Sequence, residues 1–122
     1  MANEVSVSVS LQVNNGNMSF VKRDSYTADQ SAGGGPSNGV QEIGTSYESI
    51  SITDITNKGF VYFGNLDTAN YVEIGVEVSS TFYPLIKLGA GESATMRLSP
   101  AVTVYGRANT AAVKVETYCF EA

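Results

Sequence analysis

The chain has 122 residues, enough for a domain that buries about two-thirds of its unfolded surface without disulfides or metals. It carries seven basic and twelve acidic residues, a net charge of −5, and the basic residues are dispersed, which argues against the cationic patch that nucleic acids require. Histidine is absent and cysteine occurs once, which excludes a histidine-based catalytic centre and an internal disulfide.

The first third of the chain predicts two strands and a loop. Residues 5–13 alternate valine or leucine with serine or glutamine without exception, and only a β-strand places such residues on two distinct faces. Residues 14–17 predict a turn into a second strand over 18–26, with Phe20 as its core anchor. Residues 29–39 contain three consecutive glycines and no large apolar side chain, so they predict a flexible loop.

Further strands are predicted along the rest of the chain. A short run of residues that is apolar on both faces, 60–63, suits the interior of a sheet. Pro84 predicts an edge strand or a bulge, because proline cannot donate to the strand ladder. The other expected strands cover 40–55 with a bend at Gly44, 72–78, 82–88, 94–98, 102–105 and 113–119.

About eight or nine short strands, with turns every 8 to 12 residues and no helix, predict an all-β fold. We expect a single domain over residues 1–122, an antiparallel β-sandwich that is jelly-roll-like or immunoglobulin-like, with a barrel as the alternative. The period-two pattern predicts these core residues: Val5, Val7, Val9, Leu11, Val13, Phe20, Ile50, Ile52, Val61, Phe63, Val72, Ile74, Val76, Met96, Leu98, Val102, Val104, Val113 and Val115.

The carboxylates do not form a pattern typical of catalysis or metal binding. Glu73 and Glu77 share one face of a strand but stand about 13 Å apart, farther than a glycosidase pair. Asp24 and Asp29 flank the glycine-rich segment without the additional oxygen ligands that calcium needs. We therefore predict no metal site and no carboxylate-based catalysis.

Two other features have structural interpretations. Residues 32–36 lack the Lys-Ser/Thr of a phosphate-binding loop and precede no helix. Cys119 has the same strand parity as Val113 and Val115, so we expect it to be a buried core thiol. The sequence thus predicts a protein that is not an enzyme, with no catalytic residue and no cofactor site.

The first residues show no basic region followed by an apolar run, and no apolar stretch approaches the roughly 18 residues of a membrane helix. We expect synthesis in the cytosol and no membrane partner. The outward face of the first strand carries no charge, and no proline or lysine protects it. This strand is expected either to pair inside its own sandwich or to pair with a neighbouring chain by strand addition.

The second half carries a resemblance, in the run Lys87-Leu-Gly-Ala-Gly-Glu-Ser-Ala-Thr-Met-Arg-Leu98, the run Val102-Thr-Val-Tyr-Gly-Arg-Ala-Asn-Thr-Ala-Ala-Val-Lys-Val-Glu116 and the final Cys-Phe-Glu-Ala. With these turns and strands, residues 59–122 resemble small β-sandwich or jelly-roll virion structural proteins of tailed bacteriophages. The resemblance implies a non-enzymatic protein of the virion, assembled in the host cytoplasm, that contacts other virion proteins as a homo-oligomer. Trimers are a common arrangement among the proteins it resembles.

Three functions remain open from the sequence. The resemblance favours a capsid decoration or cement protein that acts by protein–protein packing, or a structural component of the neck or tail. A carbohydrate- or receptor-binding module is the alternative, because seven tyrosines supply amphipathic aromatic surface. Serine, threonine, asparagine and glycine make the surface neutral and hydroxyl-rich, which suits packing or display.

Overall fold

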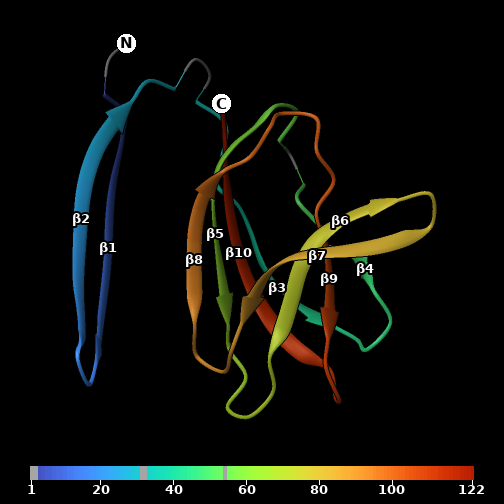
Figure 1. The fold of residues 1–122 in the computed structure, drawn as a ribbon. Helices are drawn as coiled ribbons and strands as arrows, with labels where there is room; N and C mark the ends of the chain where they lie inside the picture. The colour runs from blue at the N-terminus through green and yellow to red at the C-terminus, as the bar shows by residue number, and fades with distance from the viewer. Residues whose placement is uncertain (1–2, 31–32, 54) are drawn as a thin grey trace. The chain divides into compact units, whose positions relative to one another are not determined.

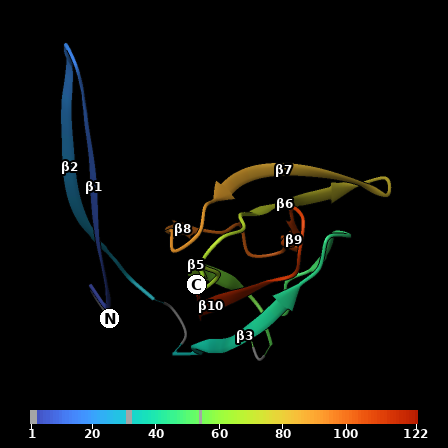
Figure 2. The same cartoon turned by 90° about the horizontal axis from the view of Figure 1, so that it is seen from below.

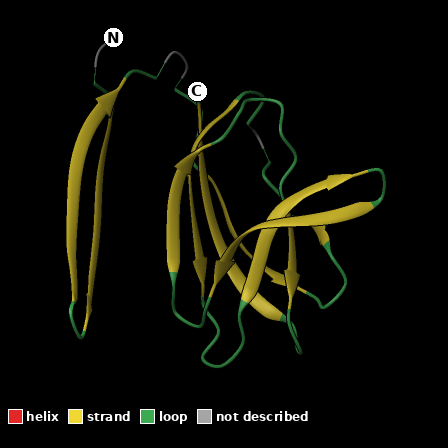
Figure 3. Ribbon diagram, in the orientation of Figure 1, coloured by secondary structure: helices red, strands yellow, loops and turns green. Residues whose placement is uncertain are grey.

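The computed structural model describes residues 3–30, 33–53 and 55–122, and those residues form ten strands and no helix (Figures 1 and 3). The all-β prediction is confirmed, with every strand pair antiparallel. Contacts within the chain divide it into two compact units, Met1–Ala32 and Gly33–Ala122. The expectation of one domain over 1–122 stays a prediction, and the units are described one at a time.

The first unit is a long hairpin of β1 (Val5–Asn15) and β2 (Met18–Ala28). The two strands pair over their whole length, from Val5 with Ala28 to Asn15 with Met18. Gly16 begins the two-residue turn with φ of 57°, the position at which type II′ hairpin turns place glycine. The predicted turn and both predicted strands are confirmed, although each strand is longer than the pattern indicated.

The second unit contains the other eight strands in two four-stranded sheets. One sheet has the order β3-β10-β5-β8, formed by β3 (Ser37–Ile43), β10 (Val113–Glu121), β5 (Lys58–Asn65) and β8 (Ser93–Arg97). The other has the order β4-β9-β6-β7, formed by β4 (Glu48–Ser49), β9 (Tyr105–Ala108), β6 (Val72–Val78) and β7 (Thr81–Leu88). In Figure 2, β6 and β7 lie in one layer and β3 and β10 in the other.

The pairing of these eight strands is nested. The first strand of the unit pairs with the last, β3 with β10, and inside that pair follow β4 with β9, β5 with β8 and β6 with β7. The four pairs form one long antiparallel ribbon that folds over on itself. Two further antiparallel pairs, β10–β5 and β6–β9, join the folded parts of this ribbon into the two sheets. Nested pairing in two sheets is the topology of a jelly roll, so of the two sandwich types expected, the jelly-roll type is the one found.

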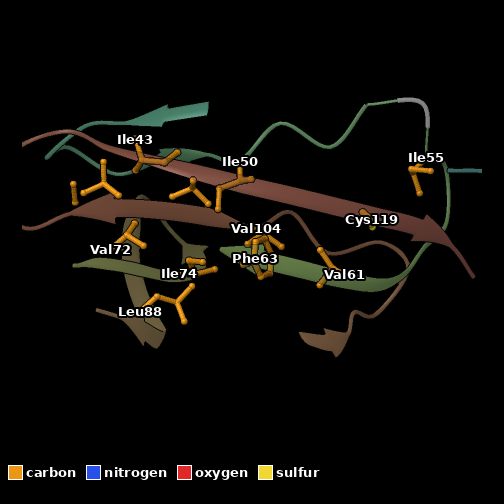
Figure 4. Close-up of a cluster of buried hydrophobic side chains, with 13 residues drawn as sticks. Ile43, Ile50, Ile55, Val61, Phe63, Val72, Ile74, Leu88, Val104 and Cys119 are labelled. Atoms are coloured by element: carbon orange, nitrogen blue, oxygen red, sulfur yellow. The ribbon is translucent and has the colours of Figure 1, made fainter. Parts of the chain in front are cut away.

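One hydrophobic cluster joins the two sheets (Figure 4). The cluster includes Val61 and Phe63 of β5 and Val72 and Ile74 of β6, all at most 2% exposed. Burial of Ile50, Val61, Phe63, Val72, Ile74, Val104, Val113 and Val115 was predicted and is confirmed, as is that of Val7 in the hairpin. The pattern missed Ile43, Ile55, Phe60, Leu88 and Ala108, which are also buried. Ile52, Met96, Leu98 and Val102 pack partly buried against the cluster.

Several expectations were wrong. Val9, Leu11 and Phe20, predicted in the core, are at least half exposed, because their hairpin is a two-stranded sheet outside both sheets of the jelly roll. For the same reason, the interpretation that the first strand pairs inside its own sandwich is wrong. Val5, Val13 and Val76 are only partly buried.

Strand boundaries also differ from the expectation. Residues 50–53 and 102–104 are not in strands, although Ile50 donates its N–H to the carbonyl of Val104 at 2.8 Å. The predicted loop over 29–39 is shorter, since Ser37 already pairs with Cys119 as the start of β3. Residues 31–32 of that loop lie outside the described residues. Pro84 does lie in an edge strand, β7, beside a register shift, as predicted.

Asn65 anchors the loop that leads from β5 to β6. Its buried side chain donates to the carbonyls of Asn70 and Leu88, both at 3.0 Å, and accepts the N–H of Asp67 at 2.8 Å. Asp67 in turn accepts the N–H groups of Asn70 at 2.6 Å and Ala69 at 3.0 Å. These side-chain bonds replace the backbone ladder where the chain crosses between the sheets.

Candidate interaction surfaces

The hairpin has one apolar face. Residues directly opposite in an antiparallel pair share a face, so the register assembles this face from alternate residues of both strands. Its central rows pair Val9 with Asp24 and Leu11 with Lys22, and the next row pairs Val13 with Phe20. The full set, called here the apolar hairpin face, has Lys22 and Asp24 at its centre and Asn15 at its turn end, and its other members are Val5, Val7, Val9, Leu11, Val13, Met18, Phe20, Tyr26 and Ala28.

Much of this face is exposed. Val9 is 51% exposed, Leu11 56%, Met18 54% and Phe20 50%. In the core of the second unit, by contrast, Val61, Val72, Ile74, Val113 and Val115 are each at most 2% exposed. The reverse face is polar, formed by Ser6, Ser8, Ser10, Gln12, Asn14, Ser19, Val21, Arg23, Ser25 and Thr27. A two-stranded hairpin alone is at best marginally stable in water, because it has no second layer to cover its apolar side. The apolar hairpin face is therefore the leading candidate for an interaction surface.

The outer face of the β4-β9-β6-β7 sheet carries a second cluster. The ring of Phe82 stacks on Tyr47, with centroids 5.5 Å apart, and the guanidinium of Arg107 lies 4.9 Å from the Phe82 centroid. Tyr105 meets Tyr47 edge-on at 5.9 Å. The loop residue Tyr47 is thus joined to strands β7 and β9, in an arrangement that sequence parity within single strands could not reveal.

Glu73 and Glu77 lie on this same outer face, and each is engaged. Glu73 accepts a hydrogen bond at 2.7 Å from Arg107 and forms an ion pair with it. Glu77 accepts the hydroxyl of Tyr47 at 2.7 Å. The hydrogen bond to Glu77 raises the pKa of Tyr47 above 10.0, with smaller contributions from burial and the nearby charge. Glu73 is thus bound by Arg107 of β9, and Glu77 by the loop residue Tyr47.

Cys119 is fully buried in the shared core, on the same side of β10 as Val113 and Val115, which confirms the prediction. Burial raises the pKa of its thiol above 9.0, so the thiol is protonated at neutral pH. Its Sγ lies 3.8 Å from the carbonyl oxygen of Phe120, at the limit of a weak hydrogen bond. Cys119 therefore serves as a small packing residue.

The remaining candidate positions are separated. Asp24 accepts the backbone N–H of Ser25 at 2.9 Å, and Asp29 accepts that of Asn3 at 2.7 Å. Over the described ranges, 3–30, 33–53 and 55–122, no three residues among His, Cys, Asp and Glu are grouped as a metal site requires. Of the segment 32–36, Ala32 lies outside those ranges.

An apolar cavity of about 150 Å³ opens in the second unit beside β7 and β8. Phe63, Ile74, Met96 and Leu98 line it, and its rim includes Leu85, which is 73% exposed. Leu85 is the extra residue of β7 at the register shift, between Pro84, which pairs with Gly75, and Ile86, which pairs with Ile74. Arg97 and Ser99 also line the cavity, whose volume and mostly apolar walls suit an apolar side chain.

Within the part of the chain that the structure describes, no helix is long and apolar enough to cross a membrane. Comparison with protein families, curated proteins and solved structures finds no match to this chain.

Proposed function

We propose that this chain is a non-enzymatic structural protein of a tailed-bacteriophage virion, a capsid decoration or cement protein that acts by protein–protein packing. A position in the neck or tail is the nearest variant of the same proposal. The observation that carries it is the apolar hairpin face, where Val9, Leu11 and Phe20 are at least half exposed on a sheet of only two strands. Such a surface is suited to protein–protein packing, against a second copy of this chain or against another protein.

The topology of the second unit supports the proposal by analogy. Jelly rolls form the domains of many viral capsids, but lectins and cupins also have this architecture. The fold alone therefore does not assign a function. The turns that carry the resemblance to virion structural proteins lie within this unit. Gly89-Ala-Gly91 joins β7 to β8, and Asn109-Thr110 precedes β10.

The proposal is tested on particles from the phage that encodes this chain. Purified virions are separated on a density gradient, and the chain is quantified against the major capsid protein by mass spectrometry. A fixed ratio of many copies per particle is expected for a decoration protein, and a few copies for a neck or tail component. Absence of the chain from intact particles would overturn the proposal.

Carbohydrate binding is the second candidate, favoured by the cluster on the outer face of the β4-β9-β6-β7 sheet. Tyr47 and Tyr105 are partly exposed there beside the carboxylates of Glu73 and Glu77, and rings with adjacent carboxylates are groups that sugars can contact. A glycan array probed with the purified chain tests it. Binding that Tyr47→Ala removes would favour this function, whereas an array without any binding would reject it.

A further inference from the structure

We infer that the hairpin binds a second copy of this chain, face to face and antiparallel, about a twofold axis through the middle of the apolar hairpin face. The inference goes beyond the proposed function, since it names the hairpin's own partner and concerns the purified chain whether or not it is found on a virion. Its basis is the placement of the two charges on the face. Lys22 and Asp24 flank Arg23, and Arg23 lies with Ser10 at the centre of the hairpin register.

A twofold axis that runs perpendicular to the strands, in the plane between the two hairpins, reverses the order of the rows in the second copy. It lays β1 on β1 of the second copy and β2 on β2, each antiparallel, with the two sheets about 10 Å apart. Because Lys22 and Asp24 are equally far from the centre, each then faces the other residue type in the second copy. Two Lys22–Asp24 pairs form across the contact, one on each side of the axis.

The apolar residues match in the same arrangement. Val9 faces Leu11 of the second copy and Tyr26 faces Phe20, according to their rows in the hairpin register. The row of Val7, which is only 8% exposed in the single chain, comes opposite the row of Val13. Only the end row is mixed, where Val5 faces Asn15. This one face is therefore self-complementary in both charge and apolarity, as a twofold contact between identical chains requires.

The other face-to-face orientation, with the twofold axis along the strands, does not pair the charges. A twofold axis along the strands would lay β2 on β1 of the second copy, row on row, so that Asp24 would face Val9 and Lys22 would face Leu11. Each charge would then be buried against a hydrocarbon side chain without a counter-charge, which is strongly unfavourable. The charges therefore select the antiparallel orientation.

The size of the face sets the strength of the contact. Eleven residues per strand at about 3.3 Å and two strands about 4.8 Å apart give a face on the order of 350 Å² per copy, less than half of a standard interface. We therefore expect a reversible dimer whose population rises with concentration. Four strands in two layers also give each hairpin the second layer that a single hairpin lacks.

Charge exchange in the full-length chain tests the inference, with sedimentation velocity over a concentration series as the measurement. Lys22→Glu places a second carboxylate against Asp24 of the other copy, and Asp24→Lys places two ammonium groups together, so each variant alone should stay monomeric. A one-to-one mixture of these variants restores both opposite-charge pairs and should dimerise. The double variant K22E/D24K should also dimerise with itself but not with the wild-type chain.

Arg23→Glu is the matched control, because Arg23 lies between the two charges but on the polar face, and this variant should dimerise like the wild-type chain. A circular dichroism spectrum of each variant checks that the strands are retained. A wild-type chain that is monomeric at all soluble concentrations, or that forms trimers, would overturn the inference. So would dimers that the single exchanges leave unchanged. None of these results bears on the particle test, so the two proposals can fail independently.

Discussion

Asn65 shows how a single polar residue can hold a jelly roll together. Asn65→Ala removes the donor that satisfies the carbonyls of Leu88 and Asn70, and the acceptor for Asp67, at a site that is 2% exposed. Loss of buried hydrogen bonds of this kind should lower the free energy of unfolding by about 2 to 4 kcal/mol. Urea unfolding of the variant measures it, with Asn57→Ala, an exposed asparagine, as the control. Equal stability of the two variants would contradict this account.

Asp67 makes a contribution to the stability of the fold that is lost at acidic pH. Hydrogen bonds from the N–H groups of Asn70 and Ala69 lower the pKa of its carboxyl below 3.8 in the folded state. A lowered folded-state pKa means that the stabilisation is fully present above 3.8 and is lost as the pH falls through the folded-state value. Asp67→Asn should therefore be less stable than the wild-type chain at neutral pH, and the difference should shrink below 3.8. Unfolding curves across that range test it, and a difference independent of pH would contradict the prediction.

Gly75 is required by a close approach of two backbones. It lies at the register shift between β6 and β7, where a Cβ would overlap the carbonyl oxygen of Tyr83 and crowd the Cα of Pro84. Because backbone atoms cannot move aside as flexible side chains do, Gly75→Ala should cost about 3 kcal/mol or more. Thermal unfolding against Gly33→Ala, a position with open space around it, is the comparison. Similar melting temperatures for the two variants would contradict a requirement for glycine at position 75.

At the scale of the element, the β6–β7 hairpin turns through two strained residues. Ser79 and Ser80 have φ of 52° and 63°, a conformation that costs a residue other than glycine or asparagine about 1 kcal/mol. Replacing the pair by Asn-Gly should raise the free energy of unfolding by about 1 kcal/mol. Ser46→Gly, in a bend without positive φ, should give no such gain. A double variant no more stable than the wild-type chain would contradict the assignment.

The elements also show what a sequence pattern can and cannot predict. Strict alternation located β1 and β6 correctly because every second side chain in them differs in polarity. The same alternation says which residues share a face but not what covers that face, so Val9 and Leu11 were assigned to a core that does not include them. Ile50 and Val104 are buried from irregular segments, where period two carries no information.

The candidate surfaces were predictable to different degrees. The uncharged first strand already indicated a contact with another chain, but the Lys22–Asp24 arrangement needed the hairpin register. The Tyr47, Phe82 and Arg107 cluster depends on three segments that meet only in the folded chain, and no local signal marks it. The burial of Cys119 was predictable because Cys119 continues the two-residue alternation of Val113 and Val115 along the same strand.

At the scale of the whole molecule, the buried cluster lies entirely within residues 43 to 119. The jelly roll should therefore fold without the hairpin. A chain lacking residues 1–32 should unfold cooperatively and give dispersed amide resonances in an NMR spectrum. It should also sediment as a monomer if the hairpin is the site of self-association. An aggregated or unfolded product would show that the second unit depends on the first.

The nested pairing has a consequence for the order of folding. Loop-closure entropy grows with the length of chain between two partners, and that length increases outward through the pairs Val78–Thr81, Gly64–Ser93, Glu48–Gly106 and Ile43–Val113. Each inner pair, once formed, shortens the loop that the next pair must close. The strands can therefore pair in the order β6–β7, β5–β8, β4–β9 and β3–β10. The outermost pair, which seals the core around Cys119, then forms last, and until it does the edges of β3 and β10 stay open to other chains.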